Sequence, residues 1–365
     1  MNTEIIQLMI DWIEEHLVEN FSIQDLGKAM GYSPYYCSFK FHQQTGITLK
    51  KYIQRRLLFL ASQELIQQPN LPIITIAINY GYSSQEAFSR SFKSMYGITP
   101  YNYRQSKKLI QNYHTLKLKK EIGDYMIDGS KKIELAAKQE NRQATYDTAI
   151  LNILNGEFMY HDFKSNQLMG NSDYVPFNEA MCSNESTYPI FSSKFIKTRA
   201  TGHKSTPENY IKKVWAPLKI LQDKEYECLV LWFGDDMFCQ INLLTILAYL
   251  EQIQYKGDIY YHAIHEKNYS INEYKLTLGV YTALYKDVIL NKRYQNNAPL
   301  PVLHQGIKHY LDLSNPANPI RQFIQMNDAL TDNELLIKLM LLFPDYGLGD
   351  SQYNQLINDH RRLHS

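Results

Sequence analysis

The segment IQDLGKAMGYS at positions 23–33 recurs fifty residues later, at positions 73–83, as IITIAINYGYS. After one inserted residue the similarity resumes, so that the stretch from Phe41 to Thr48 corresponds to the stretch from Phe92 to Thr99. Each copy has the pattern of an apolar helix, a Gly-Tyr-Ser turn and a second helix that ends at a glycine. This pattern is typical of a helix-turn-helix. The sequence therefore predicts an all-α domain with two such units.

The first copy contains signals for both of its helices. An apolar stripe with helical spacing is formed by Ile23, Leu26, Ala29 and Met30. Ser22 suits the N-cap of this helix, and Gly31 suits the left-handed turn that ends it. Ser33 is the expected N-cap of the second helix, and Pro34 suits the first helical position.

The second copy uses the same signals, with Gly81 at the turn and Ser83 as the expected N-cap of its second helix. The apolar stripe of its first helix is Ile73, Ile76, Ala77 and Tyr80. The second helix can pack inward through Ala87, Phe88, Phe92 and Tyr96. Its outward residues are Gln85, Glu86, Ser89, Arg90 and Lys93. Gln and Arg pair with adenine and guanine, Glu can accept from cytosine, and a lysine one turn further on suits a phosphate.

The corresponding helix of the first copy has a different outward set. These residues are Tyr35, Tyr36, Ser38, Phe39 and His42. The set has fewer hydrogen-bonding groups, so we expect it to read DNA by shape and methyl contact, or to be the less specific half. The stretch from Thr48 to Gln67 lacks Pro and Gly and predicts a spacer helix. Two reading helices about 34 Å apart would enter successive major grooves of double-stranded DNA.

The distribution of charge supports a nucleic-acid partner, although the formal net charge is only +1. Residues 1–19 contain five acidic residues and no Lys or Arg. Residues 20–120 contain 14 Lys and Arg residues against three acidic ones, and the remainder contains 24 against 29. The basic excess coincides with the repeated unit, as a phosphate-binding surface requires.

On these residues, positions 3–108 resemble the AraC/XylS family of bacterial transcription regulators. The resemblance rests on the two Gly-Tyr-Ser units, on Tyr52, Arg55-Arg56-Leu57 and Ala61 in the spacer, and on the stretch from Ile76 to Arg104. It implies base contacts by Tyr35, Ser38 and Phe39 in the first unit, and by Gln85, Glu86, Ser89 and Arg90 in the second. One departure concerns Phe39 and Lys40, because the family usually has a basic and then an apolar residue there. This swap affects the base preference expected of the first helix.

The rest of the chain has a different pattern. Residues 109–148 are polar and charged, and we interpret them as a partly helical linker. Residues 149–365 predict an α/β domain with a mostly parallel sheet, followed by helices from about Ser314. The buried strands are expected at 149–154, 227–234 and 258–262, with an apolar helix from Met237 to about Ile253. This half is similar to a bacterial α/β family of unknown function, through Asn155-Gly156, the stretch 231–243 and the stretch 347–353.

Open α/β sheets bind ligands at the carboxyl ends of their strands, where Asn155, Asp235 and Asp236 fall. These three are the candidate ligand-binding residues. The alternative is that one of the aspartates only caps the helix that follows. His262 and His265 have a spacing that suits a metal site on a helix, but the segment predicts a strand, where the two side chains face opposite sides. No metal site, catalytic residue or cofactor is therefore predicted.

Four scattered cysteines suit a reducing compartment, and the sequence contains no signal peptide or apolar run of transmembrane length. We therefore expect a cytoplasmic, non-enzymatic DNA-binding regulator whose C-terminal domain senses a small-molecule effector or contacts a protein. RNA polymerase and a second copy of the chain are candidate protein partners. Two alternatives stay open: an enzyme fused to the DNA-binding module, and a C-terminal domain that only dimerises.

Overall fold

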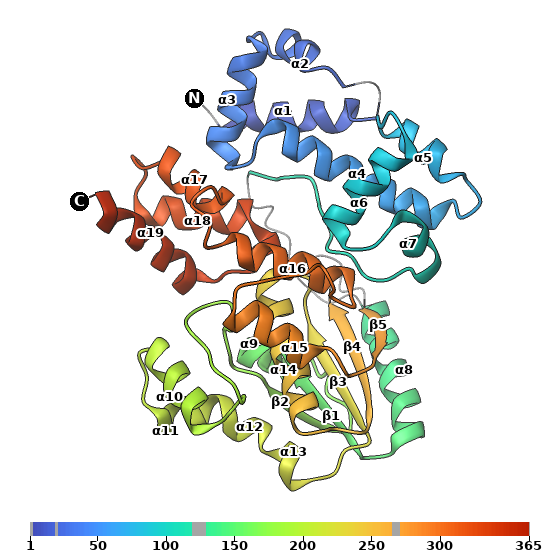
Figure 1. The fold of residues 1–365 in the computed structure, drawn as a ribbon, viewed down its shortest axis with the longest axis vertical. Helices are drawn as coiled ribbons and strands as arrows, with labels where there is room; N and C mark the ends of the chain where they lie inside the picture. Colours follow the sequence, from blue (N-terminus) through green and yellow to red (C-terminus); the bar gives the residue numbers. More distant parts are fainter. Residues whose placement is uncertain (1–2, 19–20, 119–128, 265–270, 365) are drawn as a thin grey trace. The chain divides into compact units, whose positions relative to one another are not determined.

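The computed structural model describes residues 3–18, 21–118, 129–264 and 271–364, and the chain divides into two compact units (Figure 1). The helical unit comprises residues 1–122 and 296–365. The α/β unit comprises residues 123–295. The helical unit is thus built from two stretches of chain that flank the α/β unit in sequence. None of the described helices is long and apolar enough to cross a lipid bilayer.

The first stretch of the helical unit contains the two predicted helix-turn-helix units. Its helices are α1 (Thr3–His16), α2 (Ile23–Met30), α3 (Pro34–Thr45), α4 (Leu49–Gln67), α5 (Ile73–Asn79), α6 (Gln85–Tyr96) and α7 (Pro100–Ser106). Helices α2 and α3 form the first unit, α5 and α6 form the second, and α4 is the spacer (Figure 1). The predicted all-α architecture is confirmed for this part of the chain.

Most of the predicted caps are present. The hydroxyls of Ser22 and Ser33 accept from the backbone N–H groups of Asp25 and Tyr36. The cap of α6 was expected at Ser83 but is Ser84, whose Oγ accepts from the N–H of Ala87 at 3.1 Å. The reason is the inserted residue, which lies in the turn of the second copy and moves the start of α6 one position along the chain. Helices α3 and α6 are therefore equivalent at an offset of 51 residues.

The core of the second helix-turn-helix confirms its predicted inward face. Phe88, Phe92 and Tyr96 are completely buried, and they pack with Leu58 of α4 and Tyr103 of α7. Ring centroids are 5.6 Å apart for Phe88 and Phe92 and 4.7 Å apart for Phe92 and Tyr96. Burial of aromatic side chains of this size dominates the stability of a small core. The core therefore fixes which face of α6 points to solvent.

The stripe predicted for α2 needs one correction. Leu26 is buried as expected, but Ala29 is exposed and Gly27 is buried in its place. The carbonyl oxygen of Tyr32 approaches Gly27 so closely that a built Cβ would lie 2.8 Å from it. The turn after α2 thus folds back over Gly27, which with Ile23, Leu26 and Met30 forms the i, i+3, i+4, i+7 face of the helix, whereas Ala29 lies outside that face.

The second stretch of the helical unit comprises four α-helices and a short 3-10 turn. They are α16 (Pro301–Asp312), α17 (Pro319–Met326), α18 (Asp332–Leu342), η3 (Pro344–Tyr346) and α19 (Asp350–His364). Apolar side chains of α18 and of the residue after it are buried: Leu335, Leu339, Leu342 and Phe343. Helices were expected here, but as the end of a single domain that covers residues 149–365. The observed division differs, because residues 296–365 belong to the helical unit.

The predicted linker is also divided between the units. Leu109, Ile110, Tyr113 and Leu116 are buried in the helical unit, and the N–H of Val302 donates to the carbonyl of Leu109 at 3.1 Å. Further along, α8 (Gly129–Tyr146) is a helix of the α/β unit. The polar composition of residues 109–148 concealed a buried strip of apolar side chains at its beginning.

The α/β unit contains a five-stranded sheet in the order β2-β1-β3-β4-β5. The strands are β1 (Ile150–Leu154), β2 (Asp173–Pro176), β3 (Cys228–Phe233), β4 (Asp258–Ile264) and β5 (Ile271–Leu276). Neighbouring strands are parallel except for β4 and β5, so the predicted mostly parallel sheet is confirmed. Strands β2 and β5 were not predicted. Both lie at the edges of the sheet, where the apolar pattern is weaker.

The described part of this unit also contains helices and short helical turns (Figure 1). Besides α8, they are α9 (Gly156–Ser165), α10 (Ser193–Gly202), α11 (Pro207–Tyr210), η1 (Ile211–Trp215), α12 (Ala216–Leu218), α13 (Ile220–Asp223), α14 (Met237–Gln252), α15 (Tyr281–Tyr285) and η2 (Lys286–Leu290). Residues of α8 and α9 form one core cluster with Ile150, Val230 and Trp232 of the sheet. Every residue of β1 and β3 is buried, as expected for the central strands of a parallel sheet.

Candidate nucleic-acid interface and candidate ligand site

Helix α6 presents its predicted reading residues to solvent. Gln85, Glu86, Arg90 and Lys93 are exposed, and Ser89 is half-buried. The buried aromatic face and the Ser84 cap fix the rotation and the starting point of the helix. The four exposed side chains lie on the first two and a half turns, and an N-terminal portion of this kind is what a helix-turn-helix presents to base edges. The arrangement can therefore make hydrogen bonds in a major groove.

Helix α3 presents an aromatic surface instead. Tyr35 is 80% exposed and Phe39 is 48% exposed. Tyr36 and Ser38 are half-buried. The ammonium of Lys40 lies 5.7 Å from the Phe39 ring centroid and 5.9 Å from that of Tyr36. Lys40, one of the two residues that depart from the family pattern, thus places its positive charge near the exposed Phe39 ring and the half-buried Tyr36 ring.

His42 was predicted to face DNA, but its surroundings are different. Its Nε2 lies 3.2 Å from the Gln322 side-chain oxygen of α17, within hydrogen-bonding distance. The side chain is half-buried at the last turn of α3. His42 therefore takes part in packing between the two stretches of the helical unit, and sequence reasoning gave no signal for this contact.

An internal ion pair supports the start of α4, where basic residues are concentrated. The Arg56 guanidinium donates to both Glu14 carboxylate oxygens, and the hydroxyl of Tyr52 donates to the same carboxylate at 2.7 Å. Arg56 is buried, so it is not a phosphate ligand. Arg55 lies near Asp345, with 3.9 Å between Nη1 and Oδ2. The basic block of the sequence thus includes arginines that hold the fold together.

The candidate ligand residues of the α/β unit lie at the carboxyl ends of β1 and β3. The N–H of Asn155 donates to the carbonyl of Trp232, and its Nδ2 lies 2.9 Å from Cys239 Sγ. Asp236 accepts from the N–H of Cys239 at 2.8 Å and is the N-cap of α14, so the predicted capping role is present. The structure therefore brings Asn155 and Asp236 together around Cys239. Asp235 is half-exposed beside them.

A buried ion pair next to this edge was not anticipated. Glu179 and Arg199 have no exposed side-chain surface, and 2.6 Å separates Arg199 Nη2 from Glu179 Oε1. Burial by itself raises the pKa of Glu179, but the hydrogen bond from His203 and the charge of Arg199 outweigh it and lower the pKa to about 2. Arg199 also donates to the carbonyls of Ala180 and Ser183. The pair thus fixes the loop that follows β2.

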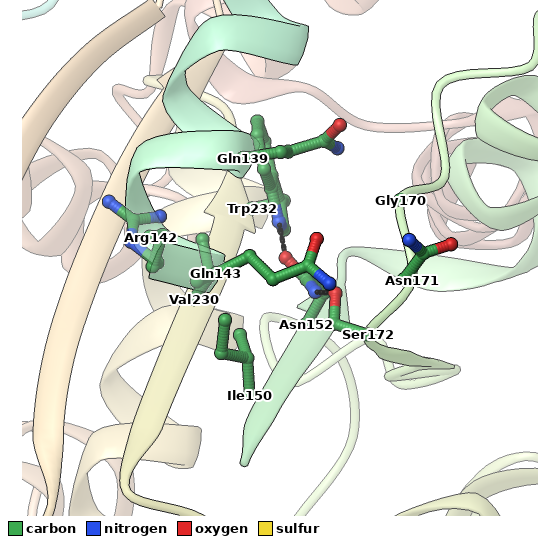
Figure 2. Close-up of a pocket in the computed structure, with 10 residues that line it drawn as sticks. All are labelled: Gln139, Arg142, Gln143, Ile150, Asn152, Gly170, Asn171, Ser172, Val230 and Trp232. Atoms are coloured by element: carbon green, nitrogen blue, oxygen red, sulfur yellow. Dashed lines mark hydrogen bonds between the residues drawn. The ribbon is translucent and has the colours of Figure 1, made fainter. Parts of the chain in front are cut away.

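A hollow on the α8 side of the sheet has a polar lining (Figure 2). The residues that line it include Gln139, Arg142, Gln143, Asn171, Ser172 and Trp232. Trp232 Nε1 donates to Asn152 Oδ1 at 2.9 Å, and Asn152 Nδ2 donates to Ser172 Oγ at 2.8 Å. These bonds pair the polar groups of Trp232 and Asn152, and the remaining space suits water rather than a metabolite.

His262 lies on β4 at the same side of the sheet. Its Nε2 is 2.7 Å from the Glu273 carboxylate, and its ring centroid is 4.2 Å from that of Trp232. Burial lowers the pKa of His262, although the neighbouring Glu273 carboxylate acts to raise it. His265 lies outside the described residues. Among the residues that the structure describes, no three His, Cys, Asp or Glu side chains are grouped so that they could hold a metal ion.

Comparison with known proteins assigns the first part of the chain. Residues 26–106 match a family described as a helix-turn-helix domain. The regulatory protein SoxS of Salmonella typhimurium is 42% identical over 101 residues, which are 28% of this chain and 94% of SoxS. The multiple antibiotic resistance protein MarA of Escherichia coli is 33% identical over 107 residues, or 29% of this chain and 84% of MarA.

Among solved structures, a Chromobacterium violaceum transcriptional regulator with an AraC-type DNA-binding domain is 26% identical. The similarity covers 28% of this chain and 94% of that one, with a TM-score of 0.26. The two curated relatives match only the helix-turn-helix part, so they say nothing of the α/β unit. Since SoxS is matched over nearly its whole length at 42% identity, the chain belongs to the AraC-type family of helix-turn-helix, DNA-binding transcription regulators.

Proposed function

We propose that this regulator recognises a specific DNA sequence by inserting α3 and α6 into two successive major grooves of one duplex. The observation that carries the proposal is the equivalence of the two helices. Each follows a capped turn, buries an aromatic or apolar face, and leaves the side chains of its first turns exposed. Two such helices on one folded unit suit two grooves one helical turn apart, about 34 Å.

The two helices differ in the kind of recognition that their side chains favour. In α6, Gln85 and Arg90 can make paired hydrogen bonds to adenine and guanine, and Glu86 can accept from cytosine. In α3, Tyr35 and Phe39 offer apolar surface to thymine methyl groups, while Ser38 can bond to either type of base. We therefore assign base-specific readout mainly to α6, and methyl and shape readout to α3.

Selection from a random duplex library by the purified full chain tests this proposal. The salt concentration should be near 150 mM, because phosphate contacts alone give strong binding at low salt. The expected result is one motif of roughly 20 base pairs, with two defined segments about one helical turn apart. Recovery of unrelated sequences only would reject sequence-specific binding.

Replacing Arg90 by Ala is expected to weaken binding to the selected site by about 1–3 kcal/mol and to relax specificity at one base pair, because the pairing to guanine is lost. Lys93→Ala is the matched control on the next turn of α6. This substitution should weaken binding to all DNA sequences alike, since it removes a phosphate contact. It should also lower by about one the slope of the logarithm of the binding constant against the logarithm of the salt concentration. Titrations on selected and scrambled duplexes measure both effects. Equal losses on the two duplexes for Arg90→Ala would contradict its assignment to a base.

For the α/β unit we propose an effector site at the carboxyl ends of β1 and β3, formed by Asn155, Asp235 and Asp236. Two observations support it. Asn155 and Asp236 converge on Cys239. Next to them, Gly156 has a φ of +91°, and no heavy atom lies within 4 Å of a built Cβ, which leaves its backbone open to a ligand. Asn155 is held in place by Cys239 and by Asn242, whose Nδ2 donates to Asn155 Oδ1 at 2.9 Å, and the two carboxylates beside it suit a small polar molecule with hydrogen-bond donors.

A thermal-shift screen of polar metabolites tests the effector proposal. A compound present at a hundred times its dissociation constant should stabilise the protein by about 2.7 kcal/mol. Asp235→Asn should reduce the shift, whereas Asp223→Asn, at the end of α13, should leave it unchanged. No shift with any compound, together with a dimer by light scattering, would instead favour an α/β unit that serves self-association or contacts such as RNA polymerase.

Two ion-paired carboxylates of the α/β unit, apart from the Asp235 and Asp236 that the enzymatic alternative names, do not suit acid–base catalysis. A general acid or base works best with a pKa near the operating pH. Burial acts to raise the pKa of Glu179, but the hydrogen bond from His203 and the charge of Arg199 outweigh burial and lower the pKa to about 2. The pKa of Glu273 is also lowered to about 2, first by the hydrogen bond from His262. Both carboxylates are therefore held as ion-paired, charged groups, which suits a structural role.

A further inference from the structure

Both reading helices end at a glycine that lies against the C-terminal helices of the same unit. Gly46 follows α3 with a φ of +69°, and a built Cβ would lie 2.6 Å from the carbonyl oxygen of Pro319 in α17. Gly97 follows α6 with a φ of +73°, and a built Cβ would lie 2.7 Å from the ring of His304 in α16. Equivalent points of the two repeats thus contact two different helices of one continuous segment.

Polar contacts surround each of these points. At α3, Asn327 Nδ2 donates to the carbonyl of Gln43 at 2.8 Å, and Gln322 lies within hydrogen-bonding distance of His42. At α6, the ammonium of Lys308 donates to the carbonyl of Ser94 at 2.6 Å. The carbonyls of Gln43 and Ser94 belong to the last turns of their helices, where the backbone acceptors lack partners within the helix. The C-terminal helices therefore supply partners that both helix ends need.

The two points of attachment are rigidly connected. Asn318, which is completely buried between α16 and α17, donates to the hydroxyl of Tyr346 at 3.0 Å and to Asp312 at 3.3 Å. Arg321 of α17 donates back to the carbonyl of Leu313 at 3.1 Å. The Tyr346 ring also packs on His309 of α16, with 4.7 Å between the ring centroids. A displacement of α17 relative to α16 would break these bonds together.

From these contacts we infer that residues 296–365 form a brace that holds the ends of α3 and α6 in one relative position. The brace would therefore restrict the protein to DNA sites with one spacing between the two contacted segments. Without the brace, the two helix-turn-helix units are joined by the spacer α4 and by the strip after α7, whose Ile110 packs in the core of the second unit and whose Leu118 N–H donates to Gln7 of α1 at 2.9 Å. Small rotations about these connections would change the separation of the reading helices. The inference of spacing selectivity rests on the proposed function. The inference of a rigid separation does not.

A distance measurement without DNA tests the rigid separation. Spin labels are attached to the full chain at Tyr35→Cys and Gln85→Cys, one on each reading helix; the four native cysteines are buried. The brace variant is Gln322→Ala/Asn327→Ala, combined with Lys308→Ala. The control is Gln325→Ala/Asn333→Ala, which removes exposed side chains of the same types from α17 and α18. We expect a single narrow distance distribution in the parent and control, and at least a doubling of its width in the brace variant. Equal widths in all three would overturn the brace.

Binding to duplexes with altered spacing tests the functional consequence. The selected duplex is compared with versions that carry one extra base pair between the two segments, and with versions in which one segment is scrambled. The parent and control should bind the natural spacing at least tenfold more tightly than the extended one. In the brace variant, the ratio of the affinities for the natural and the extended spacing should be at least threefold smaller. The affinity of this variant for duplexes with a single intact segment should change less than twofold. An unchanged preference in the brace variant would overturn the inference of spacing selectivity.

The two readouts separate the possible failures. If the parent shows a narrow distance distribution that broadens in the brace variant but binds no specific DNA, the proposed function fails and the brace stands as a structural feature. If specific DNA is bound with two contacted segments but the variant changes neither the distance nor the spacing preference, the brace fails and the proposed function stands.

Discussion

Replacing Arg199 by Ala is expected to lower the free energy of unfolding of the α/β unit by about 3–5 kcal/mol. The substitution leaves the Glu179 carboxylate buried without its main counter-charge, because both side chains are inaccessible to solvent. It also removes the donors to the carbonyls of Ala180 and Ser183. Urea unfolding followed by tryptophan fluorescence measures the loss. A Trp12→Phe background restricts the signal to the two tryptophans of the α/β unit.

Lys224→Ala is the matched control, because Lys224 and Asp173 form an ion pair of similar length, 2.7 Å, whose side chains are 45% and 39% exposed. An exposed pair contributes at most about 1 kcal/mol. If Arg199→Ala cost no more than this control, the interpretation of Glu179 and Arg199 as a buried pair that orders the loop after β2 would be wrong.

The same pair gives a pH dependence with a defined sign. Burial acts to raise the pKa of Glu179, and the His203 hydrogen bond and the Arg199 charge lower it from the ordinary value of 4.5 to about 2. A carboxyl group with a lowered pKa in the folded state stabilises the protein above its unfolded pKa. This contribution should be fully present above about pH 4.5 and should disappear as the pH falls toward 2. The stability difference between the parent and Arg199→Ala should therefore shrink over that interval.

Gly46→Ala is expected to destabilise the helical unit more than Gly31→Ala does. Both glycines are in the left-handed region, with φ of +69° and +71°. A side chain there costs about 1–2 kcal/mol in either case. Only at Gly46 would the added methyl group overlap a backbone atom, the carbonyl oxygen of Pro319, which adds about 1–3 kcal/mol. At Gly31, a built Cβ has no heavy atom within 4 Å.

Native-state hydrogen exchange in α4 measures this difference, because its slowest amides report the opening of the helical unit. Gly97→Ala and Gly81→Ala form a second matched pair, at the equivalent positions of the other repeat. If the members of each pair were equally destabilised, α16 and α17 would not be seated against the ends of the reading helices.

The sequence alone was sufficient for features that arise from local pattern. The repeated turn, the spacer helix and the buried strands β1 and β3 each have a periodicity or a cap that can be recognised within about 20 residues. The N-cap of α6 was assigned to Ser83 instead of Ser84 because the second copy contains one inserted residue. Comparison of the two copies shows that a residue is inserted, but it does not show whether the insertion comes before or after the cap. Ala29 was misassigned because the i+4 position of the α2 face is occupied by Gly27, which has no apolar side chain to reveal it in the sequence.

Other features could not be predicted because they depend on contacts between distant residues. Gln43 and Asn327 are separated by 284 positions, and neither belongs to a pattern that would suggest a contact. Glu179 and Arg199 resemble ordinary surface charges in the sequence, and only the fold shows that they are buried. The division of the chain had the same cause, since polar residues around position 120 suggested a linker while the apolar residues before it pack in the helical unit.

The most direct test of the central claim is a hydroxyl-radical footprint of the full chain on its selected duplex. The account predicts two protected segments on one face of the DNA, with centres about 10 base pairs apart, since α3 and α6 would occupy successive major grooves. Arg90→Ala should weaken protection of one segment more than that of the other. A single protected segment, or uniform protection along the duplex, would contradict recognition by two reading helices.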